Sequence, residues 1–218
     1  MKITKFPQSC LLIETKEKKI LTDPGNLKYK EKYFDIWNNV DIILITHKHP
    51  DHCNAEILEK LNKNIIIYST KEVAEANKSL KISIIKENDI IELDNIKIEV
   101  VHAIHGYQPL LKGAKEVHEN VGYIIDDESN RLYTTSDTIC FKNDYKADIL
   151  CIPVTGYGLT MSAFEASLYA KEVGAVLTIP IHMDNTAFPP DFNFIKEMFE
   201  KYEVEYEILD NDESIEVE

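Results

Sequence analysis

Three histidines and one aspartate lie within six positions of the sequence, in the stretch HKHPDH at residues 47–52. This stretch directly follows VDIILIT at 40–46, a nearly continuous apolar run that is typical of a strand buried on both faces. Polar groups at a buried strand end are unfavourable unless a partner pairs them, and a divalent cation suits imidazole and carboxylate together. The pattern therefore predicts a metal site at the end of this strand.

The spacing of these residues indicates two neighbouring ions. His47 and His49 are two positions apart on an extended segment, so both side chains point to the same side and can bind one ion. Asp51 and His52 follow the bend at Pro50 and can turn toward a second ion. An H-x-H-x-D-H pattern would arise by accident in about one chain in two thousand of this composition, so a solvated polar loop is the weaker interpretation.

Five motifs resemble those of the metallo-β-lactamase superfamily, and they follow that family's order along nearly the whole chain. They are LTDPG at 21–25, HKHPDH at 47–52, VHAIHG at 101–106, TTSDT at 134–138 and IPIHMD at 179–184. The chain looks most similar to the branch that contains ascorbate 6-phosphate lactonase. It departs from that branch at Ser136, where the branch often has glycine, and in the stretch PVTGYGLTM at 153–161.

The resemblance implies a ligand set of imidazoles and carboxylates. These are His47, His49 and His105 for one ion, Asp51, His52 and His182 for the other, and Asp137 for both. Asp23 would lie beneath the ions and orient a ligand histidine through its free N–H. His102, three positions before His105, would face the opposite side of a strand and is the less favoured candidate.

The resemblance also implies a fold of the α/β (α+β) class, the four-layer αββα metallo-β-lactamase sandwich, as a single hydrolase domain over residues 1–218. Apolar runs and turn signals predict the elements. The expected strands are 9–14, 19–23, 40–46, 65–69, 82–85, 89–101 with a turn at 94–95, 121–135 with a turn, 147–154, 175–182, 206–210 and 214–218. The expected helices are 55–61 after Asn54, 71–78 after Thr70, 163–173 between Ser162 and Gly174, and 190–202.

The implied activity is metal-dependent hydrolysis of a small ester, lactone or phosphodiester by a hydroxide that two metal ions share. Asp51 and Asp137 would be the catalytic residues that orient it. Zinc is favoured, while the share of carboxylates leaves manganese or iron open. The alternatives are an RNA-processing nuclease of the same superfamily, redox chemistry at a di-iron site, and a metal-binding or sensing domain without catalysis.

Composition limits the partners. The formal net charge is −14 and the 24 basic residues form no dense cluster, which disfavours nucleic acid and favours a small-molecule substrate.

The first apolar run, 10–13, is too short for a signal peptide, and no run approaches a membrane span, so we expect a cytoplasmic protein. Four scattered cysteines form no C-x-x-C motif. The superfamily branch suggests a homo-oligomer.

Some further residues have two interpretations each. His118, Tyr107 and Tyr157 are possible substrate contacts, although a solvated histidine and anchoring tyrosines are the commoner roles. Lys112 and Lys115 are candidates to bind a phosphate. Cys53, next to His52, either tunes the site or oxidises there, or faces the core, which is the favoured interpretation. YFDIW at 33–37 either walls the pocket or forms a helix packed on the sheet.

Overall fold

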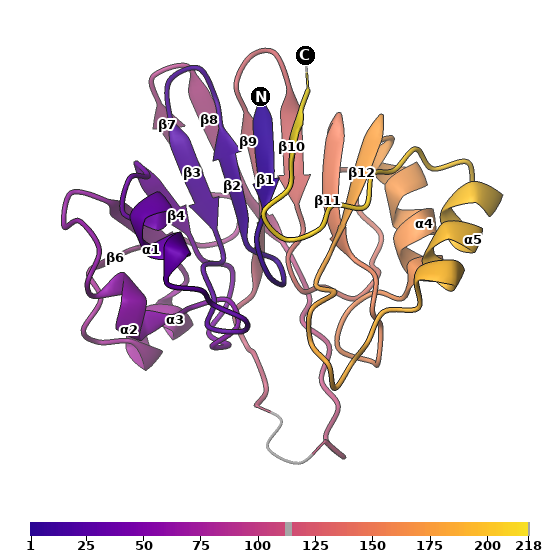
Figure 1. The fold of residues 1–218 in the computed structure, drawn as a ribbon, viewed down its shortest axis with the longest axis horizontal. Coiled ribbons are helices and arrows are strands. Elements are labelled where there is room, and N and C mark those ends of the chain that lie inside the picture. The colour runs from indigo at the N-terminus through magenta and orange to yellow at the C-terminus, as the bar shows by residue number, and fades with distance from the viewer. Residues whose placement is uncertain (112–114, 218) are drawn as a thin grey trace.

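The structure, a computed structural model, describes residues 1–111 and 115–217 and has four layers (Figure 1). Two β-sheets stack in the middle, and helices cover both outer faces. The predicted single-domain αββα sandwich is confirmed. None of the helices within the described ranges has the length and apolar character needed to cross a bilayer.

The first sheet has seven strands within the described residues. From edge to edge they are β13 (Ser214–Glu216), β1 (Lys2–Lys5), β2 (Leu11–Glu14), β3 (Lys19–Thr22), β4 (Ile42–Leu44), β5 (Ile66–Ser69) and β6 (Ile82–Ile84). Strands β3 to β6 are parallel neighbours, whereas β13, β1, β2 and β3 pair antiparallel.

The second sheet has six strands in the same part of the chain. They are β12 (Leu177–Ile181), β11 (Ile149–Pro153), β10 (Arg131–Thr134), β9 (Val121–Asp126), β8 (Ile96–His102) and β7 (Ile90–Leu93). Here β10 to β12 are parallel, and β7 to β10 pair antiparallel. Each sheet is therefore mixed: the strands on one side pair antiparallel, and those on the other side pair parallel.

Strand β4 shows why the apolar run at 40–46 is nearly continuous. Ile42 and Leu44 pack into the core between the two sheets, while Ile43 packs on the opposite face under the helices. All three side chains are buried because the strand has protein on both faces.

Helices α1 (Lys32–Trp37), α2 (Ala55–Leu58) and α3 (Lys71–Ala76) cover the first sheet, and α4 (Ala163–Val173) and α5 (Phe192–Lys201) cover the second (Figure 1). The predicted caps form. Asn54 and Thr70 accept hydrogen bonds from backbone N–H groups of α2 and α3, and Ser162 forms a capping box with Glu165. Gly174 ends α4 at φ +76°.

The structure differs from the predicted elements at several places. Strand β1 was not expected. Residues 206–210 form only an isolated bridge between Tyr206 and Thr178 where a strand was expected, so that prediction is wrong. Helix α2 ends at Leu58 rather than residue 61. Of the two interpretations of YFDIW, the structure shows the helix. Tyr33 and Trp37 are buried on the sheet, and their stacked rings have centroids 5.9 Å apart.

Candidate metal centre

The predicted ligands lie in loops at one end of both sheets, the lower end in Figure 1. The first sheet contributes ligands from the segment after β4, with Asp23 beneath them in the segment after β3, and the second contributes those after β8, β10 and β12. All five segments leave the carboxyl ends of their strands. Residues more than 100 positions apart in the sequence therefore meet at the seam between the sheets.

The ligand atoms fall into two main groups. The histidine group is His47, His49 and His105, and the mixed group is Asp51, His52 and His182; in each, the ligand atoms lie within 4.8 Å of one another. His47, His52 and Asp137 form a third such set, which links the two groups. The structure thus brings together all seven residues that the motifs suggested.

In the histidine group, neighbouring oxygens fix which ring nitrogen faces inward. The carbonyl oxygen of Lys115 lies 3.1 Å from His49 Nε2, and that of Gly106 lies 2.6 Å from His105 Nδ1. Since a carbonyl only accepts, these nitrogens carry the hydrogen and the other nitrogen of each ring has its lone pair free. His47 Nδ1 contacts Thr46 Oγ1 at 3.0 Å, and its Nε2 lies 3.2 Å from His49 Nδ1.

Side chains hold the mixed group instead. Asp23 Oδ2 accepts from His52 Nδ1 at 2.9 Å, and Thr155 Oγ1 lies 3.1 Å from His182 Nδ1. The Asp51 Oδ2 oxygen accepts from the side-chain amide of Gln8 at 3.0 Å. Each member of the mixed group therefore has its own orienting side chain.

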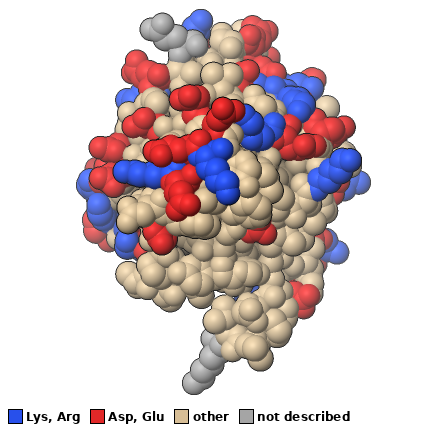
Figure 2. Space-filling view, turned by 90° about the vertical axis from the view of Figure 1, so that its right-hand side faces the viewer, with Lys and Arg blue, Asp and Glu red and all other residues tan. Residues whose placement is uncertain are grey.

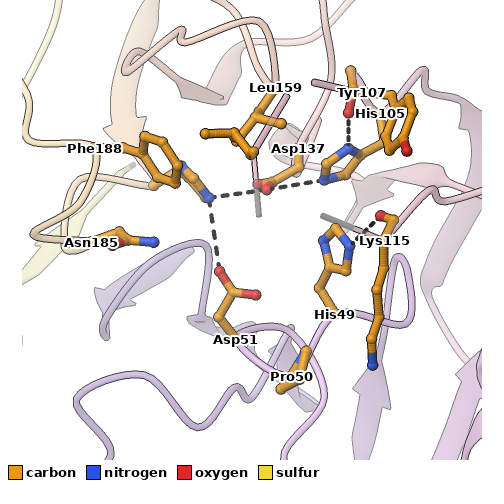
Figure 3. A pocket seen from close by; sticks show the side chains of 13 residues that line it. His49, Pro50, Asp51, His105, Tyr107, Lys115, Asp137, Leu159, Asn185 and Phe188 are labelled. Carbon is orange, nitrogen blue, oxygen red and sulfur yellow. Dashed lines mark hydrogen bonds and ion pairs between the residues drawn. The ribbon is translucent and has the colours of Figure 1, made fainter. Parts of the chain in front are cut away.

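Asp137 lies between the two groups (Figure 3). Its Oδ2 is 3.0 Å from His182 Nε2, 3.3 Å from His52 Nε2 and 3.6 Å from His105 Nε2. Ser9 donates to its other oxygen at 3.3 Å. This central position is the one that a carboxylate shared by two ions would occupy.

Asp23 is buried beneath the cluster and connects three segments. In addition to His52, it accepts from the Thr46 backbone N–H at 2.8 Å, from the Thr46 hydroxyl at 2.9 and 3.0 Å, and from Ser136 Oγ at 2.7 Å. It adopts φ 44°, an uncommon conformation for a residue other than glycine. Its position is the one that the resemblance implied.

Charge differs between the groups. Burial and the neighbouring imidazoles lower the pKa of His47 and of His49. Burial also acts against charge on His52 and His182, but the Asp137 carboxylate and other acids outweigh it and raise the pKa of both. Burial acts against the charge of Asp137 as well, yet His182 and His52 hold its pKa well below its usual range.

The cluster fits a divalent metal. His52 Nε2 and His105 Nε2 are buried without a hydrogen-bond partner among the described residues, although both point at the Asp137 carboxylate region. Such atoms are costly unless an additional partner occupies the space between them. Imidazole nitrogens and carboxylate oxygens without a thiolate suit zinc and also manganese or iron.

Two glycines allow the close packing around the site. A Cβ on Gly25 would lie 1.7 Å from the carbonyl oxygen of Asp51, and one on Gly106 would lie 2.3 Å from that of Gly158. Any side chain at these positions would displace the backbone next to a predicted ligand.

A cavity of about 410 Å³ opens over the cluster. Leu111 is among its lining residues. Tyr107, Leu159 and Phe188 line it as well, and His49, Asp51, His105 and Asp137 lie at its floor (Figure 3). Lys115 is the one lysine among its described lining residues, which include no arginine. The cavity size is typical of a small-molecule site.

The other candidate residues lie at different distances from the cavity. Tyr107 lines it, and Tyr157 packs against Phe188 with ring centroids 5.1 Å apart while its hydroxyl donates to the carbonyl oxygen of Pro189.

His118 is exposed, and its backbone N–H donates to the Glu72 carboxylate. His102 pairs with Glu87 at the surface. Cys53 is buried in the core, which raises the pKa of its thiol to about 12, and Lys112 lies outside the described residues.

Sequence reasoning missed the residues that orient the ligands: Gln8, Ser9, Thr46, Asn120 and Thr155. Thr46 and Ser9 carry a weak signal, because a hydroxyl next to a motif or at a buried turn needs a partner. Thr155 lies in the stretch 153–161, where the chain departs from the family branch, but nothing in that stretch indicated its role. Gln8 and Asn120 belong to no motif that we recognised, and only the tertiary structure brings them to the site.

Comparison with known proteins identifies the family of the chain. The family model described as the beta-lactamase superfamily domain matches residues 2–182. The chain belongs to this family. A UPF0173 metal-dependent hydrolase of Nanoarchaeum equitans is 29% identical over 230 residues and covers 100% of both chains. A UPF0173 metal-dependent hydrolase of Anoxybacillus flavithermus is 28% identical over 196 residues, covering 84% of this chain and 85% of the relative.

Solved structures agree on the fold. A metallo hydrolase from the archaeon Ignicoccus hospitalis superposes with a TM-score of 0.80 at 21% identity, covering 100% of this chain and 99% of that chain. The family, the relatives and the fold together support a metal-dependent hydrolase, the class that the motifs predicted.

Proposed function

We propose that the chain is a hydrolase with two divalent metal ions that cleaves a small, uncharged ester or lactone. The observation that supports this best is the convergence of seven imidazole and carboxylate side chains into two adjacent groups at the floor of one cavity. The histidine group would hold one ion and the mixed group the other, with Asp137 between them.

Two ions bound here would supply an activated water as nucleophile and polarise the scissile group of the substrate. The chain's own side chains would do the rest. Asp51 and Asp137 are the acceptors at the cavity floor and would orient the attacking water through its hydrogens. Apolar walls would exclude bulk water around the scissile bond and strengthen these interactions.

The cavity supports an uncharged substrate. Tyr107, Leu111, Leu159 and Phe188 provide apolar and aromatic walls, while Lys115 is the one lysine, beside no arginine, in the described lining. Figure 2 shows that Lys, Arg, Asp and Glu gather on the upper part of the visible face and are sparse on the lower part, toward the site end. Phosphate recognition usually relies on Arg and Lys, so this lining favours an ester or lactone over a phosphodiester or RNA.

The test combines metal analysis with turnover. We expect the zinc-loaded protein to hold about two ions per chain and to hydrolyse neutral lactones or esters faster than phosphodiesters. His49→Ala should lose metal and activity, whereas the control His102→Ala, at a surface histidine paired with Glu87, should retain both.

Full metal content and full activity in His49→Ala would refute the site. Tight binding of metal without turnover of any substrate in the panel would instead indicate a binding or sensing domain. Faster cleavage of phosphodiesters than of lactones would refute the substrate preference.

A further inference from the structure

Gln8 lies in the turn between β1 and β2 and has no exposed surface. Its backbone adopts φ 61°, in the left-handed region that residues other than glycine seldom occupy. Its backbone N–H donates to Asp184 Oδ2 at 2.8 Å, and its carbonyl accepts from the His182 N–H at 3.0 Å. A strained, fully buried polar residue with this many partners has a defined structural task.

The side-chain amide has one possible orientation. Its Oε1 lies 2.9 Å from the backbone N–H of Asp184, which can only donate. The amide NH₂ must therefore face the other way, toward Asp51 Oδ2 at 3.0 Å. One side chain thus connects the loop after β12 with the loop after β4.

Gln8 contacts only one of the two ligand groups. It donates to Asp51 through its side chain and accepts from His182 through its backbone, and both residues belong to the mixed group. The orienting contacts of the histidine group come from other residues: Thr46, Lys115 and Gly106.

Asp184 fixes Gln8 in turn. Its carboxylate accepts from Lys5 Nζ and Lys28 Nζ, both at 3.3 Å, and from Asn211 Nδ2 at 2.6 Å. Lys5 is 2% exposed, so the Lys5–Asp184 ion pair is buried behind the turn. This buried pair leaves Gln8 little freedom to move away from Asp51.

We propose that Gln8 is a positioning residue that sets the affinity of the mixed group for its ion without setting that of the histidine group. This inference rests on the two-metal site proposed above. By holding Asp51 and His182 at a fixed separation, Gln8 pre-orders two of the three ligands of one ion, and the loss of such an orienting contact costs about 10- to 100-fold in metal affinity.

The experiment titrates the metal-free full chain with Zn²⁺ and measures both binding steps by native mass spectrometry and calorimetry. Gln8→Met keeps the volume and the backbone hydrogen bonds of residue 8 but removes both the donor to Asp51 and the acceptor for the Asp184 N–H. We expect the histidine group to bind the first ion as in the wild type and the mixed group to bind the second about 10- to 100-fold more weakly. The control Lys28→Met removes the half-exposed lysine from Asp184, leaves Gln8 in place and should match the wild type in both steps.

Three results would overturn the inference: wild-type affinity for both ions in Gln8→Met, an equal loss in both steps, or the same selective loss in Lys28→Met. If Gln8→Met does not fold, as judged by circular dichroism, Gln8→Ala is measured in its place under the same criteria. A wild-type chain that binds fewer than two ions would refute the two-metal function itself, which distinguishes that failure from a failure of the role of Gln8.

Discussion

The histidine group and the mixed group lie side by side but are built differently. Two of the three rings of the histidine group are oriented by backbone carbonyl oxygens, those of Lys115 and Gly106. The mixed group is oriented by the side chains of Asp23, Thr155 and Gln8. Backbone carbonyls change little with sequence, so single substitutions have more ways to weaken the mixed group.

The two groups also differ in the direction in which the pKa values of their histidines are shifted when no metal is bound. His47 and His49 have lowered pKa values and stay neutral, ready to bind a cation. His52 and His182 have raised pKa values because protons compensate the carboxylates around them. An ion in the mixed group replaces protons on His52 and His182, whereas the lowered pKa values of His47 and His49 leave fewer protons on these two rings for an ion to replace.

The largest effect is expected at Asp137, the residue that joins the groups. Asp137→Ala removes the carboxylate next to His52, His105 and His182, so both groups should lose affinity for metal. Losing about 4 kcal/mol of transition-state stabilisation corresponds to about a 10³-fold lower kcat/KM. Metal analysis and steady-state kinetics test this, with the exposed Asp144→Ala as control. Activity within tenfold of the wild type would show that the groups do not act as a unit.

A smaller and more selective effect is expected at Asp23. In Asp23→Asn an amide NH₂ can face His52 Nδ1, which disfavours the ring tautomer whose Nε2 is free for metal. We expect the second ion to bind about 10- to 100-fold more weakly, with a lesser effect on the first. Calorimetric Zn²⁺ titration measures both steps. A larger loss in the first step would reverse the proposed assignment of Asp23.

The last expected effect is that the two ions separate by pH, with a change of about tenfold per pH unit and proton. Because the raised pKa values of His52 and His182 keep protons on these rings to higher pH, lowering the pH should release the mixed-group ion first. The lowered pKa values of His47 and His49 keep the histidine group competent further into the acid range. The affinity of the mixed group should fall about tenfold per pH unit for each proton displaced. Native mass spectra between pH 8 and 5 test this, and simultaneous release of both ions would contradict it.

Local signals were enough to predict most of the fold. The nearly continuous apolar run at 40–46, the caps at Asn54, Thr70 and Ser162, and the stop at Gly174 each depend on neighbouring residues alone. Strand β1 could not be predicted in this way, since its buried Lys5 is compensated by Asp184, 179 positions later. The apolar stretch at 206–210 packs without forming a ladder, because only Tyr206 meets a strand.

Part of the candidate site could be predicted for a similar reason. His47, His49, Asp51 and His52 are neighbours in the sequence, so their chemistry is visible before any folding is considered. The residues that orient them come from distant turns, and no local pattern distinguishes Gln8 from any other glutamine. The roles assigned to the ligands, to His118 and to the two tyrosines stay predictions until variants are measured.

The seven predicted ligands lie in the segments after β4, β8, β10 and β12, which belong to different sheets, and Asp23 beneath them follows β3. During folding, the complete site would form only late, once both sheets have associated, because its contacts span most of the chain. Ions bound there would therefore mainly lower the unfolding rate of the native chain. They would change its folding rate little.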